Sequence, residues 1–336
     1  MLARALGREP GLEQRLLTRR GSELARRATL DGIAVREAPW TMGLDPRAWW
    51  RLVAEARDFR PDIIHAHNSH ALALGVWARL ALVRGGRRDP SPHLVVTRRV
   101  VFPVRPGSTL FRADRIIAIS EAVRVALVAA GVAPARIALA PSGIDPDDVR
   151  HAAAFPLGIR AKLGLPSTAR LAANIAALEP AKDQATLVRA AAHARAHRPE
   201  LHWVIAGAGP LRAALAAQAR RLGLTDRIHL IGWTDHPEAL MREADVVVMS
   251  SRAEGLGTAV LDALALGKPV VATGGGGLAE IVPAAWLVGV GDAAALAEKV
   301  VRALDHPSPF PLPAQYTAAA MAQGVLAAYT SVLERH

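Results

Sequence analysis

One stretch of the chain, residues 250–282, constrains the fold more than any other part of the sequence. It reads SSRAEGLGTAVLDALALGKPVVATGGGGLAEIV. Apolar residues recur at helical spacing from Ala259 to Leu266, and Gly267 and Pro269 mark where such a helix ends. The apolar run after Pro269 predicts a strand, and a glycine loop follows it. A loop, a helix and a strand in this order indicate one unit of a parallel α/β sheet.

The same stretch has the features of a ligand site. Glu254 is followed by Gly255, Leu256 and Gly257, and Asp262 lies two turns into the predicted helix. The free N–H groups and the positive dipole at a helix start favour phosphates and electron-rich oxygens. Glycines let the backbone approach a ligand closely, and both carboxylates can accept hydrogen bonds from hydroxyl groups. Together these features predict a site for a sugar nucleotide.

The rest of the chain alternates strands and helices, which predicts parallel, doubly wound sheets. Strands are expected at 61–67, 93–97, 115–119, 136–140, 170–177, 201–206, 227–231, 245–249 and 269–272. Helices are expected at 44–57, 69–84, 121–130 and 315–334. Residues 1–30 are expected to be helical, apart from a short strand at Leu16 and Leu17. The pattern restarts after a polar, proline-bearing connector at 146–166, which indicates two Rossmann-like domains.

The composition describes a soluble globular protein. The chain has 336 residues, of which 51% are hydrophobic and 21% charged, and it has no cysteine. Disulfides and cysteine-ligated metals are therefore excluded. No apolar run reaches the length of a membrane span, and the N-terminus lacks the apolar core of a signal peptide. We expect the protein in the cytoplasm or at the inner membrane surface.

The chain is strongly basic. Lys and Arg number 41 against 30 Asp and Glu, a net charge of +11. Such a charge suits phosphates, nucleic acid or an anionic membrane, although a coding bias toward arginine would explain it equally well. Aromatic residues are only 4% of the chain, a poor supply of stacking platforms. A nucleic-acid-binding module is therefore the last of our hypotheses, and we expect no nucleic-acid partner.

The spacing of Glu254 and Asp262 resembles the donor-site signature of family 4 of the retaining glycosyltransferases, which have the GT-B fold. That signature is an acid, Gly-X-Gly, and a glutamate eight residues after the first acid; here Asp262 replaces the glutamate. The resemblance implies two Rossmann-like domains that face each other across a cleft. It assigns residues 1–145 to the acceptor side and 146–313 to donor binding. Residues 314–336 would form a helix that crosses back to the first domain.

Other segments match the same family. His67 in His65-Ala66-His67 matches a histidine that contacts the donor sugar, and we expect His65 to point to the other face of its strand. A zinc site would need a third ligand that no motif supplies. Lys182 matches the lysine of a Gly-Arg-Leu-x-x-x-Lys phosphate clamp, whose glycine and arginine are here Ala176 and Ala177.

Three arginines are candidates to replace the clamp arginine: Arg98, Arg99 and Arg252. Further matches are the turn at Gly207-Ala208-Gly209-Pro210, a strand end at Trp233 beside the nucleotide base, and a hinge at 141–145. Asp145-Pro146-Asp147 falls in this hinge, where we expect Asp147 or Asp148 to cap a helix rather than the pair of acids to hold a metal.

The resemblance predicts a transferase that moves a hexosyl group from a nucleoside diphosphate to a glycan or lipid-linked acceptor, with retention of configuration. Glu254 would bind the sugar with the amides of 255–257, Asp262 the ribose and Lys182 the diphosphate. His67 would orient the sugar, while Gly207 and Trp233 would contribute to nucleotide binding. No metal is expected, and the setting would be synthesis of cell-envelope glycans such as lipopolysaccharide, with contact to an anionic membrane.

The beginning of the chain departs from the family. There a strand and a glycine-rich loop usually come before the first helix, whereas residues 1–6 read as the start of that helix. We therefore expect the first strand of the first domain to be missing. This departure and Ala177 motivate an alternative function, a non-catalytic sugar-nucleotide-binding protein or an inactive fragment.

Overall fold

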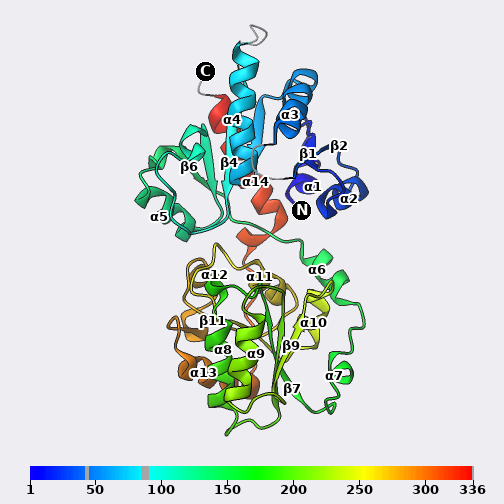
Figure 1. The fold of residues 1–336 in the computed structure, drawn as a ribbon, viewed down its shortest axis with the longest axis vertical. Coiled ribbons are helices and arrows are strands. Elements are labelled where there is room, and N and C mark those ends of the chain that lie inside the picture. The colour runs from blue at the N-terminus through cyan, green and yellow to red at the C-terminus, as the bar shows by residue number, and fades with distance from the viewer. Residues whose placement is uncertain (42–44, 85–90, 335–336) are drawn as a thin grey trace. The chain divides into compact units, whose positions relative to one another are not determined.

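The protein divides into two compact units in a computed structural model that describes residues 1–41, 45–84 and 91–334. Unit 1 comprises Met1–Pro141 and Ala318–His336, and unit 2 comprises Ser142–Thr317. The chain thus returns to unit 1 for its last helix. Each unit is built of parallel strands covered by helices (Figure 1).

In the described part of unit 1, the strands form two parallel sheets. One pairs β1 with β2, and the other has the order β3-β4-β5-β6. The strands are β1 (Leu16–Arg19), β2 (Val35–Ala38), β3 (Ile63–Ala66), β4 (His93–Arg98), β5 (Arg115–Ala118) and β6 (Ile137–Leu139). The helices are α1 (Leu2–Leu6), α2 (Glu23–Leu30), α3 (Pro46–Phe59), α4 (Ser69–Arg84), α5 (Glu121–Ala129) and α14 (Ala318–Leu333).

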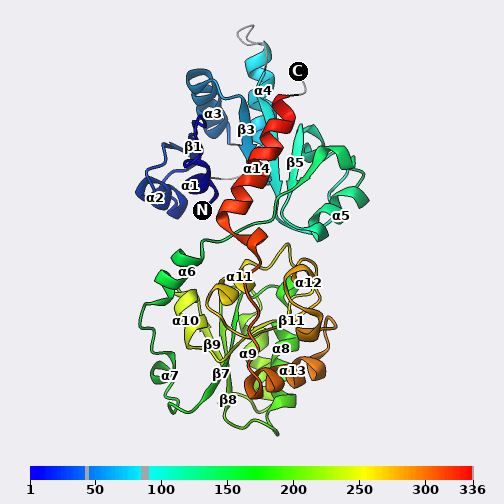
Figure 2. The same ribbon diagram turned by 180° about the vertical axis from the view of Figure 1, so that it is seen from behind.

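The last helix packs into the core of unit 1. Its residues Ala322 and Val325 form one buried cluster with Val95 of β4, Ile117 of β5 and Leu6 of α1. Figure 2 shows α14 lying across the strands of this unit, with α1 beside it. Removing these apolar side chains from water accounts for the attachment of the C-terminal segment to the first unit.

Every residue of unit 2 is described, and its strands form a parallel six-stranded sheet in the order β12-β11-β10-β7-β8-β9. The strands are β7 (Arg170–Ile175), β8 (Leu201–Ala206), β9 (Ile228–Gly232), β10 (Val246–Met249), β11 (Val270–Thr273) and β12 (Leu287–Val288). The helices are α6 (Pro146–Ala153), α7 (Ile159–Lys162), α8 (Gln184–Ala194), α9 (Arg212–Arg221), α10 (Pro237–Glu243), α11 (Thr258–Ala265), α12 (Leu278–Ile281) and α13 (Ala293–Asp305). Strand order reverses between β7 and β10, and open α/β sheets bind ligands at the carboxyl ends of such strands.

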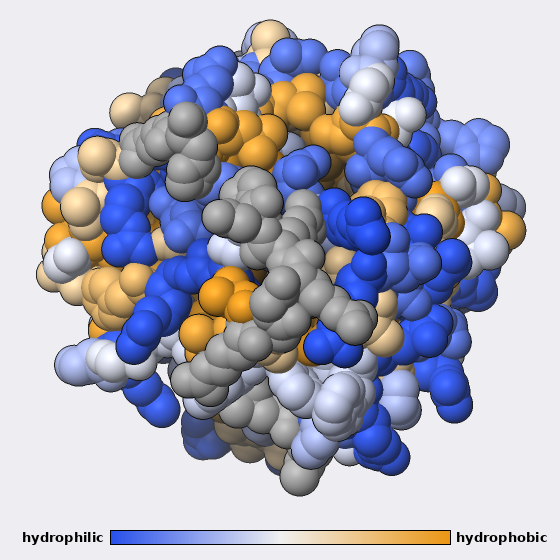
Figure 3. All heavy atoms as spheres, turned by 90° about the horizontal axis from the view of Figure 1, so that it is seen from above, coloured by the Kyte–Doolittle hydropathy of each residue, from blue (hydrophilic) through white to orange (hydrophobic). Residues whose placement is uncertain are grey.

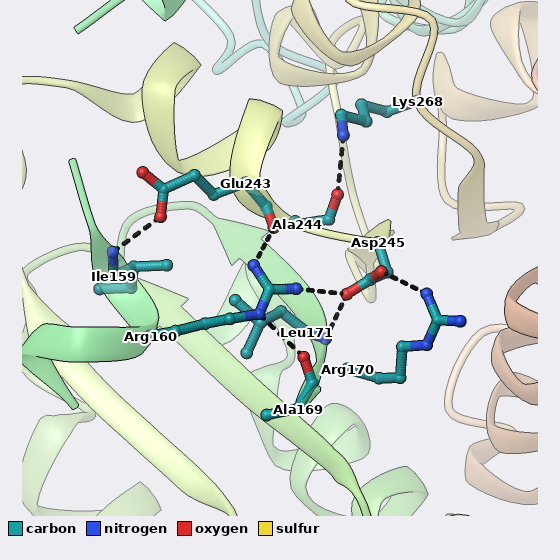
Figure 4. Close-up of polar contacts among 9 residues, drawn as sticks. All are labelled: Ile159, Arg160, Ala169, Arg170, Leu171, Glu243, Ala244, Asp245 and Lys268. Carbon is teal, nitrogen blue, oxygen red and sulfur yellow. Dashed lines mark hydrogen bonds and ion pairs between the residues drawn. The ribbon is translucent and has the colours of Figure 1, made fainter. Parts of the chain in front are cut away.

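A charged network closes the opposite edge of this sheet, where β7 and β10 begin (Figure 4). Asp245 accepts hydrogen bonds from Arg160 Nη2, Arg170 Nη1 and the Leu171 N–H, each at 2.8 Å. Lys268 Nζ donates to the carbonyl of Ala244 at 2.9 Å, and burial lowers the pKa of its amine. These charges bind α7 to the two central strands, so we assign them a structural role.

Most of the expected elements are confirmed, and three expectations are wrong. Residues 1–30 contain the expected short strand, as β1, but the helix before it is short, because α1 ends at Leu6, before Gly7 and Pro10. Strands β2 and β12 were not expected, since β2 has two charged residues in four and β12 has only two residues. The single sheet expected in the first domain is two sheets. The first element of the chain is α1, as expected from residues 1–6.

Side chains cap two helices of unit 1. Asp45 accepts a hydrogen bond from the Arg47 N–H at the start of α3, and the Ser120 hydroxyl accepts one from the Val123 N–H at the start of α5. Within the described ranges, no helix is long and apolar enough to cross a membrane.

Candidate active site

The residues expected to bind a donor lie in loops at one edge of the unit 2 sheet. In a parallel sheet all strands end at the same edge, so the loops that leave there lie together. These loops are 176–183 after β7, 207–211 after β8, 250–257 after β10 and 274–277 after β11. The fold therefore gathers segments that are far apart in the sequence.

Lys182 and Glu254 form an ion pair at this edge. Lys182 Nζ lies 2.5 Å from Glu254 Oε2, and both side chains are mostly buried. The Ser251 hydroxyl donates to the same carboxylate oxygen at 3.3 Å. Lys182 itself closes a short 3-10 turn that begins at Pro180. An ammonium group has three N–H donors, so this pair leaves Lys182 able to donate to a ligand as well.

Arg252 lies beside this pair. Its N–H donates to the carbonyl of Ala181 at 2.8 Å, and its Nε lies 2.9 Å from Asp183 Oδ2. Asp183 is buried and accepts a hydrogen bond from the Thr186 hydroxyl at 2.7 Å, which fixes the carboxylate. The Arg252 side chain is 56% exposed, and a guanidinium has five N–H donors. Lys182 and Arg252 thus place two cations on adjoining loops.

The glycine loop after β11 holds the backbone around Glu254. The Gly277 N–H donates to the Glu254 carbonyl at 3.0 Å. A Cβ atom on Gly276 would collide with that same carbonyl oxygen, and one on Gly277 would collide with the carbonyl oxygen of Gly255. Gly276 also has a φ of +64°. The glycines are therefore required where the two loops touch, and they fix the position of Glu254.

Helix α11 begins directly after Gly257, as the sequence predicts. Gly257 has a φ of +96°, and no described side chain caps the helix start. A Cβ atom at this position would lie 2.6 Å from Leu278 Cδ2. Leu256 is buried in the core, so only its backbone can serve a ligand. The helix start thus presents amide groups and a positive dipole end beside Glu254.

Asp262 is a half-buried residue of α11. Burial raises the pKa of its carboxyl from 3.8 to about 7, and the negative charge of Glu238 adds to this shift. Near neutral pH such a carboxyl exists in both protonation states, and it can accept hydrogen bonds or donate one. This behaviour suits a neutral hydroxyl partner better than a cation.

The loops after β8 and β9 complete the edge. A Cβ atom on Gly207 would collide with the carbonyl oxygen of Ala176, and the Gly207 N–H donates to the Gly232 carbonyl at 2.7 Å. Trp233 follows β9 and is 75% exposed, with its Nε1 donating to Asp235 Oδ1 at 3.1 Å. An exposed indole of this kind is suited to stacking on a flat aromatic group.

His67 belongs to unit 1, where it is exposed just after β3. The preceding His65 is anchored, with Nδ1 2.7 Å from the Tyr329 hydroxyl and Nε2 2.7 Å from the Thr97 hydroxyl. Burial lowers the pKa of His65 well below its usual value, so its ring is neutral. The ring centroids of His65 and His67 are 4.2 Å apart. Our expectation that they point to opposite faces is wrong, because residues two apart along a strand share a face.

The structure brings some predicted residues together and separates others. Those of unit 2 are Lys182, Gly207, Trp233, Glu254, Gly255, Leu256, Gly257 and Asp262, whereas His67 lies in unit 1. Arg98, a candidate for the missing clamp arginine, is also in unit 1, where it donates to the carbonyls of Val100 and Phe102. Arg252 is therefore the candidate that lies in the same unit as Lys182.

Sequence reasoning missed two members of this edge, Ser251 and Asp183. Their only signal in the sequence is that each adjoins a predicted site residue or a candidate cation. Helix α6 has a cap at this point, but the capping residue is Asp145 rather than Asp147 or Asp148: the Asp145 carboxylate accepts from the N–H groups of both of those residues. Among the residues that the structure describes, no group of three or more histidine, aspartate or glutamate side chains could hold a metal ion.

The sequence matches two families of known proteins, one in each half. Residues 158–323 match Glycosyl transferases group 1, and residues 1–148 match Glycosyltransferase Family 4. The 2-deoxystreptamine glucosyltransferase of Streptomyces kanamyceticus is 29% identical over 273 residues, which is 79% of this chain and 68% of that protein. Several D-inositol 3-phosphate glycosyltransferases also match, and the chain spans 42% to 65% of their lengths. The chain is therefore similar to Glycosyltransferase Family 4 in its first half and to Glycosyl transferases group 1 in its second half.

Crystal structures of other proteins share the fold. Anabaena HepE in complex with UDP and glucose has a TM-score of 0.73 at 22% identity, over 95% of this chain and 90% of that chain. A glycosyltransferase from Rickettsia africae has a TM-score of 0.80 at 17% identity, over 100% and 94% of the two chains. The expected GT-B fold with two Rossmann-like domains is thereby confirmed.

Proposed function

We propose that the chain is a retaining glycosyltransferase that moves a hexosyl group from a nucleoside diphosphate to a glycan or lipid-linked acceptor. The observation that carries the proposal is the Lys182–Glu254 ion pair beside the amides at the start of α11. A cation, a carboxylate and a row of amide donors match the diphosphate and the hydroxyl groups of a sugar nucleotide.

Each loop has a proposed task in holding the donor. Glu254 accepts hydrogen bonds from sugar hydroxyls, helped by the amides of residues 255–257. Asp262 binds the ribose, and Trp233 with the Gly207 turn lies against the base. His67 is the proposed contribution of unit 1 to sugar binding. UDP in the structure of Anabaena HepE, which has the same fold, supports a nucleotide of this kind.

Lys182 is proposed to neutralise the departing diphosphate. Negative charge builds on the leaving group as the glycosidic bond breaks, and a cation already in place stabilises that charge without reorganisation. Arg252 is proposed as the second cation, which compensates for Ala177 at the position of the clamp arginine. These two side chains, rather than a metal ion, supply the positive charge in this proposal.

The proposed retention of configuration gives the departing diphosphate a second task. The leaving diphosphate would stay on the face of the sugar from which it departs, and its oxygen would accept the proton of the incoming acceptor hydroxyl there. The new bond then forms on the face from which the old one broke. No protein nucleophile takes part in this scheme.

The acceptor is proposed to be a cell-envelope glycan or its lipid-linked precursor, as in lipopolysaccharide synthesis, met at an anionic membrane surface. The matched relatives carry the names of 2-deoxystreptamine and D-inositol 3-phosphate, so these two compounds belong in an acceptor screen. Ala177 favours a second candidate function, a sugar-nucleotide-binding protein that does not turn its ligand over.

Turnover measurements test the proposal. Thermal shift with UDP, GDP and ADP and their sugars identifies the donor, because a ligand that binds only the folded state raises its stability. Transfer and donor hydrolysis are then compared among the wild type, Lys182→Ala and Glu254→Ala, with the surface variants Lys162→Ala and Glu298→Ala as matched controls. We expect loss of turnover only in the first two variants. Wild-type turnover in both would refute the assignment, and binding without any turnover would establish the second candidate.

A further inference from the structure

The net charge of the chain lies entirely on unit 1. Residues 1–141 and 318–336 contain 24 arginines and no lysine against 13 aspartates and glutamates. Residues 142–317 contain 17 lysines and arginines and 17 aspartates and glutamates. A coding bias toward arginine acts on both halves of a gene and does not explain this difference. Unit 1 is therefore built for an anionic partner, whereas the unit with the proposed donor site is neutral.

Helix α4 of unit 1 is apolar on its outward side as well as toward the core. Trp77, Leu80 and Val83 are 53%, 41% and 52% exposed. They are spaced three residues apart, so they form one stripe along the helix. The core side of the same helix carries buried Leu74 and Leu82. A helix that is apolar all round normally lies inside a protein or in contact with lipid.

Helix α3 continues this apolar surface. Its Trp50 is 61% exposed and contacts Trp49, with ring centroids 4.8 Å apart. Trp49 and Trp77, from the two helices, line a common open groove of about 300 Å³. We call Trp50, Trp77, Leu80 and Val83 the α3–α4 patch. Figure 3 shows orange, apolar side chains between blue, hydrophilic ones on the face seen from above.

Arginines border the patch on α3. Arg47 is one turn before Trp50, and Arg51 directly follows it; both side chains are exposed. Each is paired with one carboxylate, Arg47 with Asp45 and Arg51 with Glu55, at 2.9 Å in both cases. A guanidinium has five N–H donors, so each arginine keeps donors for a phosphate.

We propose that unit 1 docks on an anionic lipid bilayer through the α3–α4 patch, which deepens the proposed function by naming the surface that meets the membrane. Tryptophan, leucine and valine enter the boundary between headgroups and acyl chains, while arginines pair with lipid phosphates. The positive field of unit 1 draws the protein to the surface. Nucleic acid would pair its phosphates with the arginines, but it would offer no apolar partner to the exposed side chains of Leu80 and Val83.

Vesicle co-sedimentation of the full chain tests the proposal. We expect binding to vesicles of phosphatidylcholine with added phosphatidylglycerol, weaker binding at high salt, and little binding to phosphatidylcholine alone. Leu80→Ser/Val83→Ser, and the same pair with Trp77→Ser, should weaken binding by about tenfold or more. The matched control is Val125→Ser/Val128→Ser, because these exposed valines lie on α5 of the same unit.

The outcomes separate the possible partners. Equal binding to neutral and anionic vesicles, or wild-type binding by both stripe variants, would overturn the proposal. Salt-sensitive binding to duplex DNA or RNA without vesicle binding would overturn it in favour of nucleic acid. Circular dichroism and UDP affinity of the stripe variants check folding. Loss of vesicle binding by the stripe variants with intact UDP binding and turnover would show that these substitutions affect the docking surface alone. Absence of UDP binding in the wild type would instead contradict the proposed function.

Discussion

Lys182 Nζ and Glu254 Oε2 lie 2.5 Å apart. The side chain proposed to bind the diphosphate and the side chain proposed to bind the sugar therefore neutralise each other's charge. Without Lys182, the carboxylate of Glu254 would repel a diphosphate. Lys182→Ala should therefore weaken UDP binding by about ten- to a hundredfold, since a charge-assisted hydrogen bond contributes roughly 1.5–3 kcal/mol.

The ion pair also predicts that the effects of changing Lys182 and Glu254 on UDP affinity do not add. Lys182→Ala/Glu254→Gln should bind UDP more tightly than Lys182→Ala, because the second change removes the repulsion that the first one exposes. Isothermal titration calorimetry measures both affinities, with Lys162→Ala as the control. UDP binding by the double variant that is no tighter than binding by Lys182→Ala would show that the pair is not coupled in ligand binding.

Arg252 should prove to be the second diphosphate cation. Arg252→Ala is expected to weaken UDP binding by about tenfold or more and to leave uridine binding unchanged, because only the diphosphate meets the guanidinium. Ala177 is exposed, so an arginine fits at that position. Ala177→Arg in the Arg252→Ala background should then restore UDP affinity. An equal loss for UDP and uridine would assign Arg252 a structural role through Asp183 instead.

Much of the fold could be predicted because strands and helices alternate with clear apolar patterns. The strands 201–206 and 245–249 are apolar runs bounded by polar or glycine residues, and they match β8 and β10 closely. Strand β2 could not be predicted, since Arg36 and Glu37 interrupt its apolar pattern and only its pairing with β1 defines it. The division of unit 1 into two sheets likewise depends on pairing between distant segments.

The candidate site was predictable where chemistry depends on neighbours in the sequence. Glu254 and the glycines around it were found in this way, and the start of α11 is where the pattern placed it. The pairing of Arg252 with Asp183 joins residues on different loops, which no local pattern reveals. The raised pKa of Asp262 depends on burial and on Glu238 of another helix, so it also required the structure.

Asp262 should make stability depend on pH. Its pKa is raised from 3.8 to about 7 on folding, so the folded state keeps a proton that the unfolded state releases. The folded state binds more protons between these values, and its stability therefore falls as pH rises from about 4 to 7. Asp262→Asn removes the titrating group. The unfolding free energy of this variant relative to the wild type should rise by on the order of 3 kcal/mol between pH 4 and pH 8.

Urea unfolding at the two pH values checks this expectation, with Asp226→Asn as an exposed control. The comparison between variant and wild type cancels the titration of all other groups. A pH-independent difference between Asp262→Asn and the wild type would mean that the carboxyl titrates at its ordinary pKa in the folded protein.

At the sheet edge opposite the candidate site, removing the side chain of Asp245 should lower the free energy of unfolding more than removing any other side chain of that edge. It accepts hydrogen bonds from Arg160, Arg170 and the Leu171 N–H, and its side chain is mostly buried. Asp245→Ala would leave two arginines without their shared carboxylate and an amide without its acceptor. We expect a loss of roughly 3–5 kcal/mol of unfolding free energy, against less than about 0.5 kcal/mol for the exposed control Asp226→Ala. The loss for Asp245→Asn should lie between those for Asp245→Ala and Asp226→Ala, because the amide oxygen can still accept a hydrogen bond from the Leu171 N–H. UDP affinity measured under conditions where the variants remain folded should stay within about twofold of the wild type, since the network and the donor loops lie at opposite ends of β7.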